Sequence, residues 1–139
     1  MDAGARDFEA MNSLERALLQ AQNGELATDD FLAVLLESKV FMLIDKDIGP
    51  SGVWDNSAEP MVLFNAQHAP VLAIFTAPER SSEWAMHSPK YKFGLLTDFR
   101  WLLKGVAPNV GVVVNPGSSA GLEIAPSRVV ELRTQSGRM

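Results

Sequence analysis

Cysteine is missing from this chain of 139 residues, and histidine occurs only twice. Without a thiol the chain forms no disulfide, zinc–thiolate centre or iron–sulfur cluster, and it has no cysteine nucleophile. A core that needs no disulfides fits the cytoplasm, and the acidic first residues lack the apolar stretch of a secretory signal peptide. We therefore expect a cytoplasmic protein.

Positive charge and long apolar runs are also scarce. The chain has 12 Lys and Arg against 17 Asp and Glu, for a net charge of −5, which argues against a nucleic-acid binder with a basic face. Residues 60–78 and 105–122 carry no formal charge, but Asn, Gln and Pro break them into pieces shorter than a bilayer requires. We expect neither nucleic acid nor membrane as a partner.

Common catalytic and nucleotide-binding motifs are absent or incomplete. Neither of the two frequent glycine-rich phosphate loops occurs. The stretch from Gly117 to Gly121 matches G-x-S-x-G, the turn that carries the nucleophile of α/β-hydrolases. However, we expect a strand instead of a helix after it, and no histidine follows it in the chain. A glycine–serine hairpin loop is the simpler interpretation.

Possible metal ligands and acid–base groups are equally incomplete. The segment that starts at Asp45 begins like a calcium loop, but Pro50 and Asn56 stand where such a loop needs glycine and glutamate. His68 falls in a predicted turn and His87 at a predicted helix end, so both are expected to be structural or exposed. We therefore predict no catalytic residue, no metal and no cofactor.

The N-terminal third is expected to form two helices. Asn12 or Ser13 can cap the first, and Asn23-Gly24 can end it. Thr28 can cap the second, whose first turn carries two aspartates. The apolar residues recur at helical spacing: Leu14, Ala17, Leu18 and Ala21 in the first helix, and Phe31, Val34 and Leu35 in the second.

The remaining chain alternates short apolar runs with helix signals. Strands are predicted at 40–44, 61–64, 71–75, 92–96, 110–114 and 122–124, with 65–70 as a hairpin turn. Helices are predicted at 78–87, at about 98–104 and from Pro126 through Leu132.

These elements predict one domain at 12–132, between a flexible N-terminus at 1–11 and a mobile tail at 133–139. The fold class is α/β (mixed α+β). Strands and helices alternate between 71 and 114, which implies parallel crossovers, whereas the hairpins are antiparallel. We expect one mixed sheet of five to six strands, with two N-terminal helices and crossover helices.

Charge and tryptophan point to two possible surfaces. Residues 1–59 hold 12 acids and 4 bases, whereas residues 60–139 carry a net charge of +3. The acidic third is either a pair of solvated helix faces or a surface for a basic protein partner. Trp84 and Trp101, on helices, are core fillers or interface anchors, and Trp54 lies in the 45–60 connection. If this domain forms a homodimer, Trp54 and Trp101 are the predicted interface residues.

Two segments resemble a known family. VLAIFTAPER at 71–80 and GVVVNPGSSAGLEIAPSRVVEL at 111–132 are similar to the N-terminal domain of the SseB, or enhanced serine sensitivity, family, and the resemblance extends over about 26–132. It implies a bacterial protein without an established catalytic activity. We therefore expect a non-enzymatic interaction or regulatory domain with an unknown protein partner, which is basic if the acidic third is a binding surface.

The alternative is a small-molecule binder or a cryptic enzyme. Ligands of open α/β sheets bind where parallel strands end. We predict a ligand site at the carboxyl ends of the parallel strands. Arg80 would pair with a carboxylate or phosphate of the ligand, and Glu79 would orient the ligand. A pocket with an unpaired Arg80 would favour this alternative. The predicted ligand-binding residues are Thr76, Glu79, Arg80, Asn115, Gly117 and Ser118.

Overall fold

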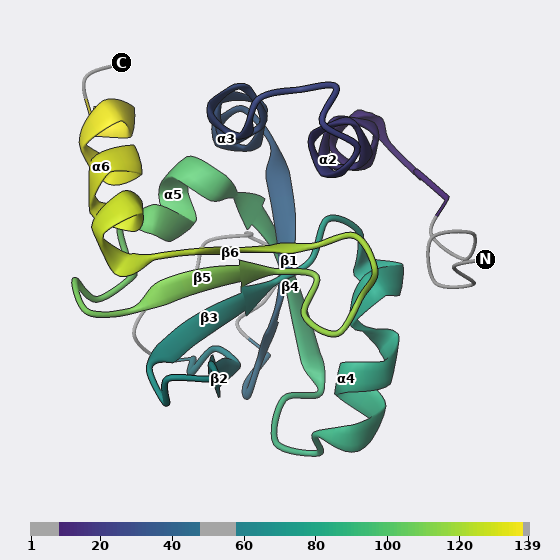
Figure 1. The fold of residues 1–139 in the computed structure, drawn as a ribbon. Coiled ribbons are helices and arrows are strands. Elements are labelled where there is room, and N and C mark those ends of the chain that lie inside the picture. The colour runs from purple at the N-terminus through teal and green to yellow at the C-terminus, as the bar shows by residue number, and fades with distance from the viewer. Residues whose placement is uncertain (1–8, 48–57, 138–139) are drawn as a thin grey trace.

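The computed structural model describes residues 9–47 and 58–137 (Figure 1). Trp54 and residues 1–8 of the predicted flexible N-terminus lie outside these ranges. The elements follow one another as α2 (Ser13–Gln22), α3 (Thr28–Leu36), β1 (Lys39–Ile44), β2 (Val62–Phe64), β3 (Pro70–Ile74), the 3-10 helix η1 (Pro78–Ser81), α4 (Ser82–His87), β4 (Phe93–Asp98), α5 (Phe99–Leu103), β5 (Gly111–Val114), β6 (Leu122–Ile124) and α6 (Pro126–Gly137).

Four strands form a mixed sheet in the order β2-β3-β5-β6. The β2–β3 and β5–β6 pairs are antiparallel, whereas β3 and β5 run parallel, with Ile74 opposite Val114. The mixed α/β class, the 65–70 hairpin and the parallel β3–β5 relation are confirmed. Parallel pairing brings the carboxyl ends of β3 and β5 to the same edge of the sheet.

The predicted single sheet with β4 in a parallel crossover is wrong. β4 pairs antiparallel with β1 in a separate two-stranded sheet, from Lys39↔Asp98 to Ile44↔Phe93. Both edges of β3 are already occupied, by β2 and β5, so β4 finds no partner there. The isolated bridges Phe41↔Phe75 and Ile44↔Pro60 link the two sheets.

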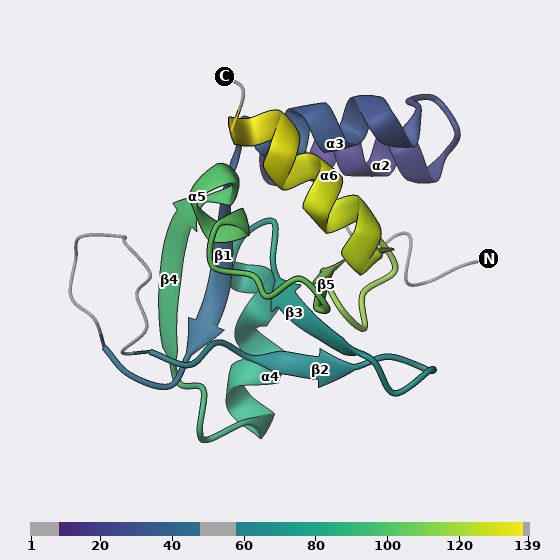
Figure 2. The ribbon, with the colours of Figure 1, turned by 90° about the vertical axis from the view of Figure 1, so that its left-hand side faces the viewer.

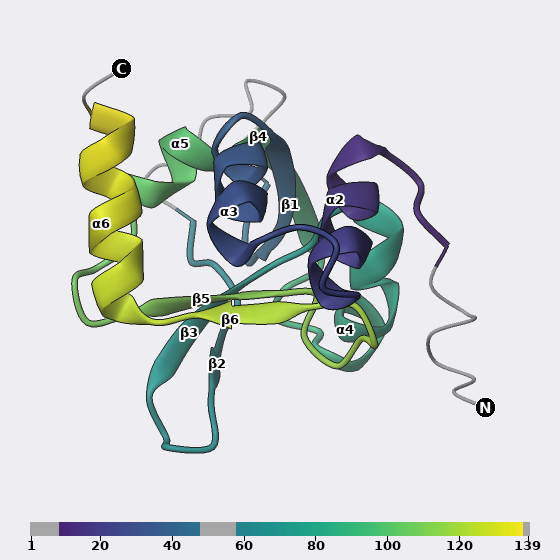
Figure 3. The same ribbon diagram turned by 45° about the horizontal axis from the view of Figure 1, so that its top comes forward.

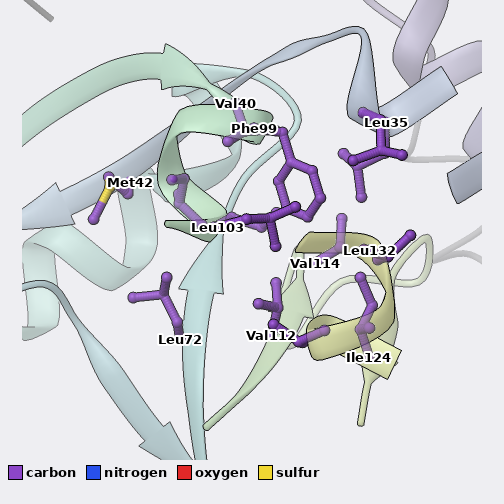
Figure 4. Close-up of a cluster of buried hydrophobic side chains, with 14 of the residues drawn as sticks. Leu35, Val40, Met42, Leu72, Phe99, Leu103, Val112, Val114, Ile124 and Leu132 are labelled. Atoms are coloured by element: carbon purple, nitrogen blue, oxygen red, sulfur yellow. The ribbon is translucent and has the colours of Figure 1, made fainter. Parts of the chain in front are cut away.

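Apolar clusters cover the strands on both faces. The larger cluster joins α2, α3, α5 and α6 to the sheet and includes Leu35, Phe99 and Leu132 (Figure 4). The smaller one contains Leu43, Met61, Ala73 and Phe75, with Trp84 of α4 packed against it. Continuous apolar runs are typical of strands that are covered on both sides.

Several helix ends differ from the sequence prediction. Asn12 caps α2 as predicted, since its side chain accepts from the Glu15 N–H. The predicted Thr28 cap is wrong: Ala27 is the N-cap of α3, and its carbonyl accepts from the Phe31 N–H at 3.0 Å. The predicted 78–87 helix begins as η1 before α4. α6 continues past its predicted end at Leu132 to Gly137, where Arg133 donates to the Val106 carbonyl.

Candidate functional site

A pocket of about 470 Å³ lies where β3 and β5 end. The chain that leaves β3 forms η1 and α4, and the chain that leaves β5 forms the 115–121 turn, so both segments meet at this edge. The Trp84 indole N–H donates to the Pro116 carbonyl at 2.8 Å and ties α4 to the turn. The lining residues are Glu79, Arg80, Ser82, Glu83, Trp84, His87, Pro116, Gly117 and Ser118.

Four of the six predicted ligand-binding residues line this pocket: Glu79, Arg80, Gly117 and Ser118. The other two, Thr76 and Asn115, are buried, with 4% and 2% of their surface exposed, and do not line it. Two of the residues assigned to ligand contact therefore belong to the interior, and ligand binding by the other four stays a prediction.

Arg80 is held by a residue that the sequence analysis did not single out. The fully buried carboxylate of Glu15, on α2, accepts from Arg80 Nε and Nη2, both at 2.9 Å. It also accepts from the Thr76 hydroxyl and from the Met11 N–H. α2 thus lies against the segment that leads from β3 to α4 (Figure 3).

The charge state of Glu15 follows from these contacts. Burial alone raises the pKa of a carboxyl group, but the hydrogen bonds from Arg80, Thr76 and Met11 outweigh it, so the pKa of Glu15 lies below its usual value of 4.5. The Glu15 hydrogen bond raises the pKa of Arg80 in turn. Both groups are ionised near neutral pH.

Asn115 joins the two strand ends behind the pocket. Its Oδ1 accepts from the Thr76 N–H at 3.0 Å, and its Nδ2 donates to Thr76 Oγ1 at 2.8 Å and to the Ala120 carbonyl at 3.1 Å. The residue has a φ of 51°, a left-handed conformation that asparagine tolerates better than most residues. We call Glu15, Thr76, Arg80 and Asn115 the Glu15 network.

The Glu15 network leaves no free cation for the predicted anion site. Arg80 is committed to Glu15 and also donates to the Glu9 carbonyl at 2.6 Å. In the ranges that the structure describes, every buried side-chain nitrogen and oxygen has a hydrogen-bond partner. The condition on which anion binding rested, an unpaired Arg80, is not met.

The open side of the pocket is acidic. Glu79 and Glu83 are exposed, and neither forms an ion pair with any other described residue. Met86 shares α4 with Glu83; it does not line the pocket and is 72% exposed. His87 Nδ1 lies 2.8 Å from the Glu83 carbonyl, at the predicted helix end. No three His, Cys, Asp or Glu side chains within the described residues are placed to hold a metal ion.

A local sequence pattern marks Glu15 as part of a helix start. Asn12 and Glu15 have the spacing of a capping box, in which the third residue of the helix bonds back to the chain before it. Here the Asn12 side chain accepts from the Glu15 N–H at 2.8 Å, and the carboxylate accepts from Met11 rather than from Asn12. The motif predicts a helix start but not the contact with Arg80, 65 residues away.

The other predicted positions are distributed over the surface. His68 lies in the hairpin turn, as predicted, with a φ of 61°. Trp101 is 44% exposed, with the Lys104 ammonium 5.1 Å from the centre of its ring, so the core interpretation of Trp101 is wrong. Its role as an interface residue stays a prediction.

A family model described as the SseB protein N-terminal domain matches residues 14–131. Because this match spans most of the chain, the protein belongs to the SseB N-terminal domain family, as the segments at 71–80 and 111–132 predicted. No curated protein and no solved structure matches the chain. Among the helices at 9–47 and 58–137, none has the length and apolar character that crossing a bilayer requires.

Proposed function

We propose that this domain is a non-enzymatic protein-interaction module that binds a basic segment of a partner protein between α4 and the 115–121 turn. The observation that carries the proposal is the contrast between the two sides of the pocket. The Glu15 network is satisfied internally, whereas Glu79 and Glu83 on the open side form no ion pair with another residue in 9–47 or 58–137. A surface of this kind attracts cationic side chains and holds no free cation for an anionic substrate.

Apolar groups beside the carboxylates support a protein partner. Met86 is largely exposed, and the thioether of methionine adapts to differently shaped partners. Trp84 packs partly against the smaller core cluster and has its indole N–H bonded to Pro116, so only the part of its ring that lines the pocket can contact a partner. Such a combination fits a lysine or arginine beside an apolar residue in a peptide. The acidic balance of residues 1–59 favours the same class of partner.

A small-molecule ligand is the second candidate. The volume of about 470 Å³ falls within the range of small-molecule sites. With Arg80 engaged by Glu15, such a ligand would be an amine that Glu79 and Glu83 bind, instead of the carboxylate or phosphate expected from the sequence.

Site-specific crosslinking tests the interaction proposal in cells that express the protein natively. A photo-crosslinking amino acid replaces Met86 in one variant and Val130 of α6 in the control, since both side chains are exposed but lie on different helices. We expect a discrete protein adduct from position 86 and none from position 130. The adduct should disappear when Glu79→Lys and Glu83→Lys are added.

Equal labelling from both positions, or no protein adduct from position 86, would contradict the proposal. In that case a thermal-shift screen with small amines distinguishes the second candidate, because a ligand at 100 times its Kd stabilises a protein by about 2.7 kcal/mol.

A further inference from the structure

Among the residues that the structure describes, no strand lies beside the outer edge of β4. Figure 2 shows β4 next to β1, at the margin of the described part of the sheet. Phe41 exchanges two backbone hydrogen bonds with Phe75, at 2.9 and 2.8 Å, so its N–H and C=O point away from β4. Leu96 is opposite Phe41. In an antiparallel pair, the backbone N–H and C=O groups of two opposite residues either all face the partner strand or all face away from it. The backbone groups of Leu96 therefore face the outer edge.

Because the backbone N–H and C=O groups of every second residue face the same edge of a strand, those of Gly94 face the outer edge as those of Leu96 do. The odd-numbered neighbours point the other way, as the bond from the Phe99 N–H to the Ser38 carbonyl at 3.0 Å illustrates. In the described residues, no hydrogen bond beyond the β1 ladder uses the backbone of Gly94 or Leu96. Such a free edge is a template for pairing with another strand.

The residues along this edge complement those of a second copy of the same strand that runs antiparallel to it. Gly94, Leu96 and Asp98 of β4 are exposed, and so is Lys92, just before the strand; Leu96 keeps 49% of its surface. If two β4 strands pair antiparallel about Leu95, Lys92 lies opposite the partner's Asp98, and Leu96 lies opposite the partner's Gly94. A shift by one pair in either direction removes both charged contacts. The outward backbone groups of Gly94 and Leu96 can also bond in this register, so the main chain permits the arrangement that the side chains favour.

The absence of a side chain at Gly94 also favours this pairing. A Cβ at this position would lie 2.0 Å from the Phe41 ring, which shows that the ring passes over the bare glycine. An opposing Leu96 would meet the partner's Gly94 and the aromatic ring beside it. Burial of an aliphatic side chain against a ring is a favourable cross-strand contact.

We propose that β4 is the interface of a two-fold homodimer, in which the β4 edges of two copies pair antiparallel about Leu95. The occupant is a second copy because the charges and the leucine–glycine contact complement the same sequence read in reverse. Trp101, three residues beyond Asp98, would lie at the rim of this interface. The proposal does not depend on the function of the pocket.

Charge reversal tests the register. In sedimentation velocity of the full chain at rising concentration, we expect the wild-type protein to form a dimer. Lys92→Asp should weaken the dimer about tenfold, because by symmetry it turns two attractive pairs into two repulsive ones. Asp98→Lys should act likewise, and the double variant should recover most of the affinity. Val130→Lys, away from the edge, is the control, and thermal unfolding verifies that each variant is folded.

Amide hydrogen exchange of the wild-type protein tests the edge itself, even if a variant fails to fold. Exchange at Gly94 and Leu96 should slow as the protein concentration rises, whereas Leu95 and Thr97, bonded to β1, should be protected throughout. A monomer at high micromolar concentration would overturn the proposal. So would a dimer in which the Gly94 and Leu96 amides exchange at an unchanged rate, or a double variant that remains as weak as the single ones.

Discussion

The Glu15 carboxylate is a buried charge with four hydrogen-bond donors around it: two from Arg80, one from Thr76 and one from Met11. Removal of one partner of a buried ion pair leaves the other without compensation. We expect Glu15→Ala to lower the free energy of unfolding by about 3 kcal/mol in urea denaturation. Glu25→Ala, at an exposed position after α2, is the control and should change it by less than about 0.5 kcal/mol. Equal effects of both substitutions would contradict the structural role of Glu15.

The same carboxylate predicts a pH dependence. The pKa of Glu15 is lower in the folded protein than its ordinary 4.5, so the unfolded chain binds its proton more readily. Its contribution is therefore fully present above the unfolded pKa and is lost as the pH falls through the folded pKa. The difference in melting temperature between wild type and Glu15→Gln should be constant well above pH 4.5 and should shrink as the pH is lowered below it. A difference that stays constant as the pH falls below 4.5 would refute the assignment.

Single residues of the site were only partly predictable from the sequence. Arg80 and Glu79 were placed at the pocket because a helix start after a buried strand is a local pattern. The partner of Arg80 was not predictable from the sequence, since Glu15 lies 65 positions earlier on another helix. Thr76 and Asn115 were assigned to a ligand because they follow two strands that were predicted to be parallel, whereas the sequence does not show their mutual hydrogen bonds.

Among the elements, the 115–121 turn depends on a close backbone approach at Gly121. A Cβ there would lie 2.4 Å from the Val114 carbonyl oxygen and 2.9 Å from that of Asn115. Because backbone atoms cannot yield as a flexible side chain does, Gly121→Ala should destabilise the protein by about 2 kcal/mol or more. A Cβ at Gly24 would meet no atom within 4 Å, and only the φ of 77° disfavours a larger residue there. We therefore expect Gly24→Ala to lower the free energy of unfolding by about 1 kcal/mol. Urea unfolding of both variants checks the order, and a smaller loss at Gly121 would contradict it.

Strand positions were predictable, but the pairing of β4 was not. Apolar runs and flanking turns are local, and so is the short hairpin between β2 and β3. The partner of β4 is β1, whose paired residues lie 49 (Ile44↔Phe93) to 59 (Lys39↔Asp98) positions earlier, and the periodicity of 92–98 does not indicate this pairing. The choice follows from which edges remain free after β3 has paired with β2 and β5.

At the scale of the whole molecule, an acidic pocket and a self-complementary strand edge lie on different elements. The pocket belongs to η1, α4 and the 115–121 turn, whereas the edge belongs to β4. A dimer through β4 would present two pockets to a partner. Binding of a partner with two basic segments would then gain from the second contact without any new residue.

A nuclear magnetic resonance titration with a lysine-rich peptide tests the central claim most directly, because the Trp84 indole N–H reports from inside the pocket. We expect the Trp84 indole signal and the backbone amides of Glu79 and Glu83 to shift with the peptide, and the shifts to shrink as salt is added. Glu79→Gln combined with Glu83→Gln should abolish them, whereas Glu25→Gln should not. The account would be contradicted if a glutamate-rich peptide shifted the same signals equally, or if the lysine-rich peptide left them unmoved.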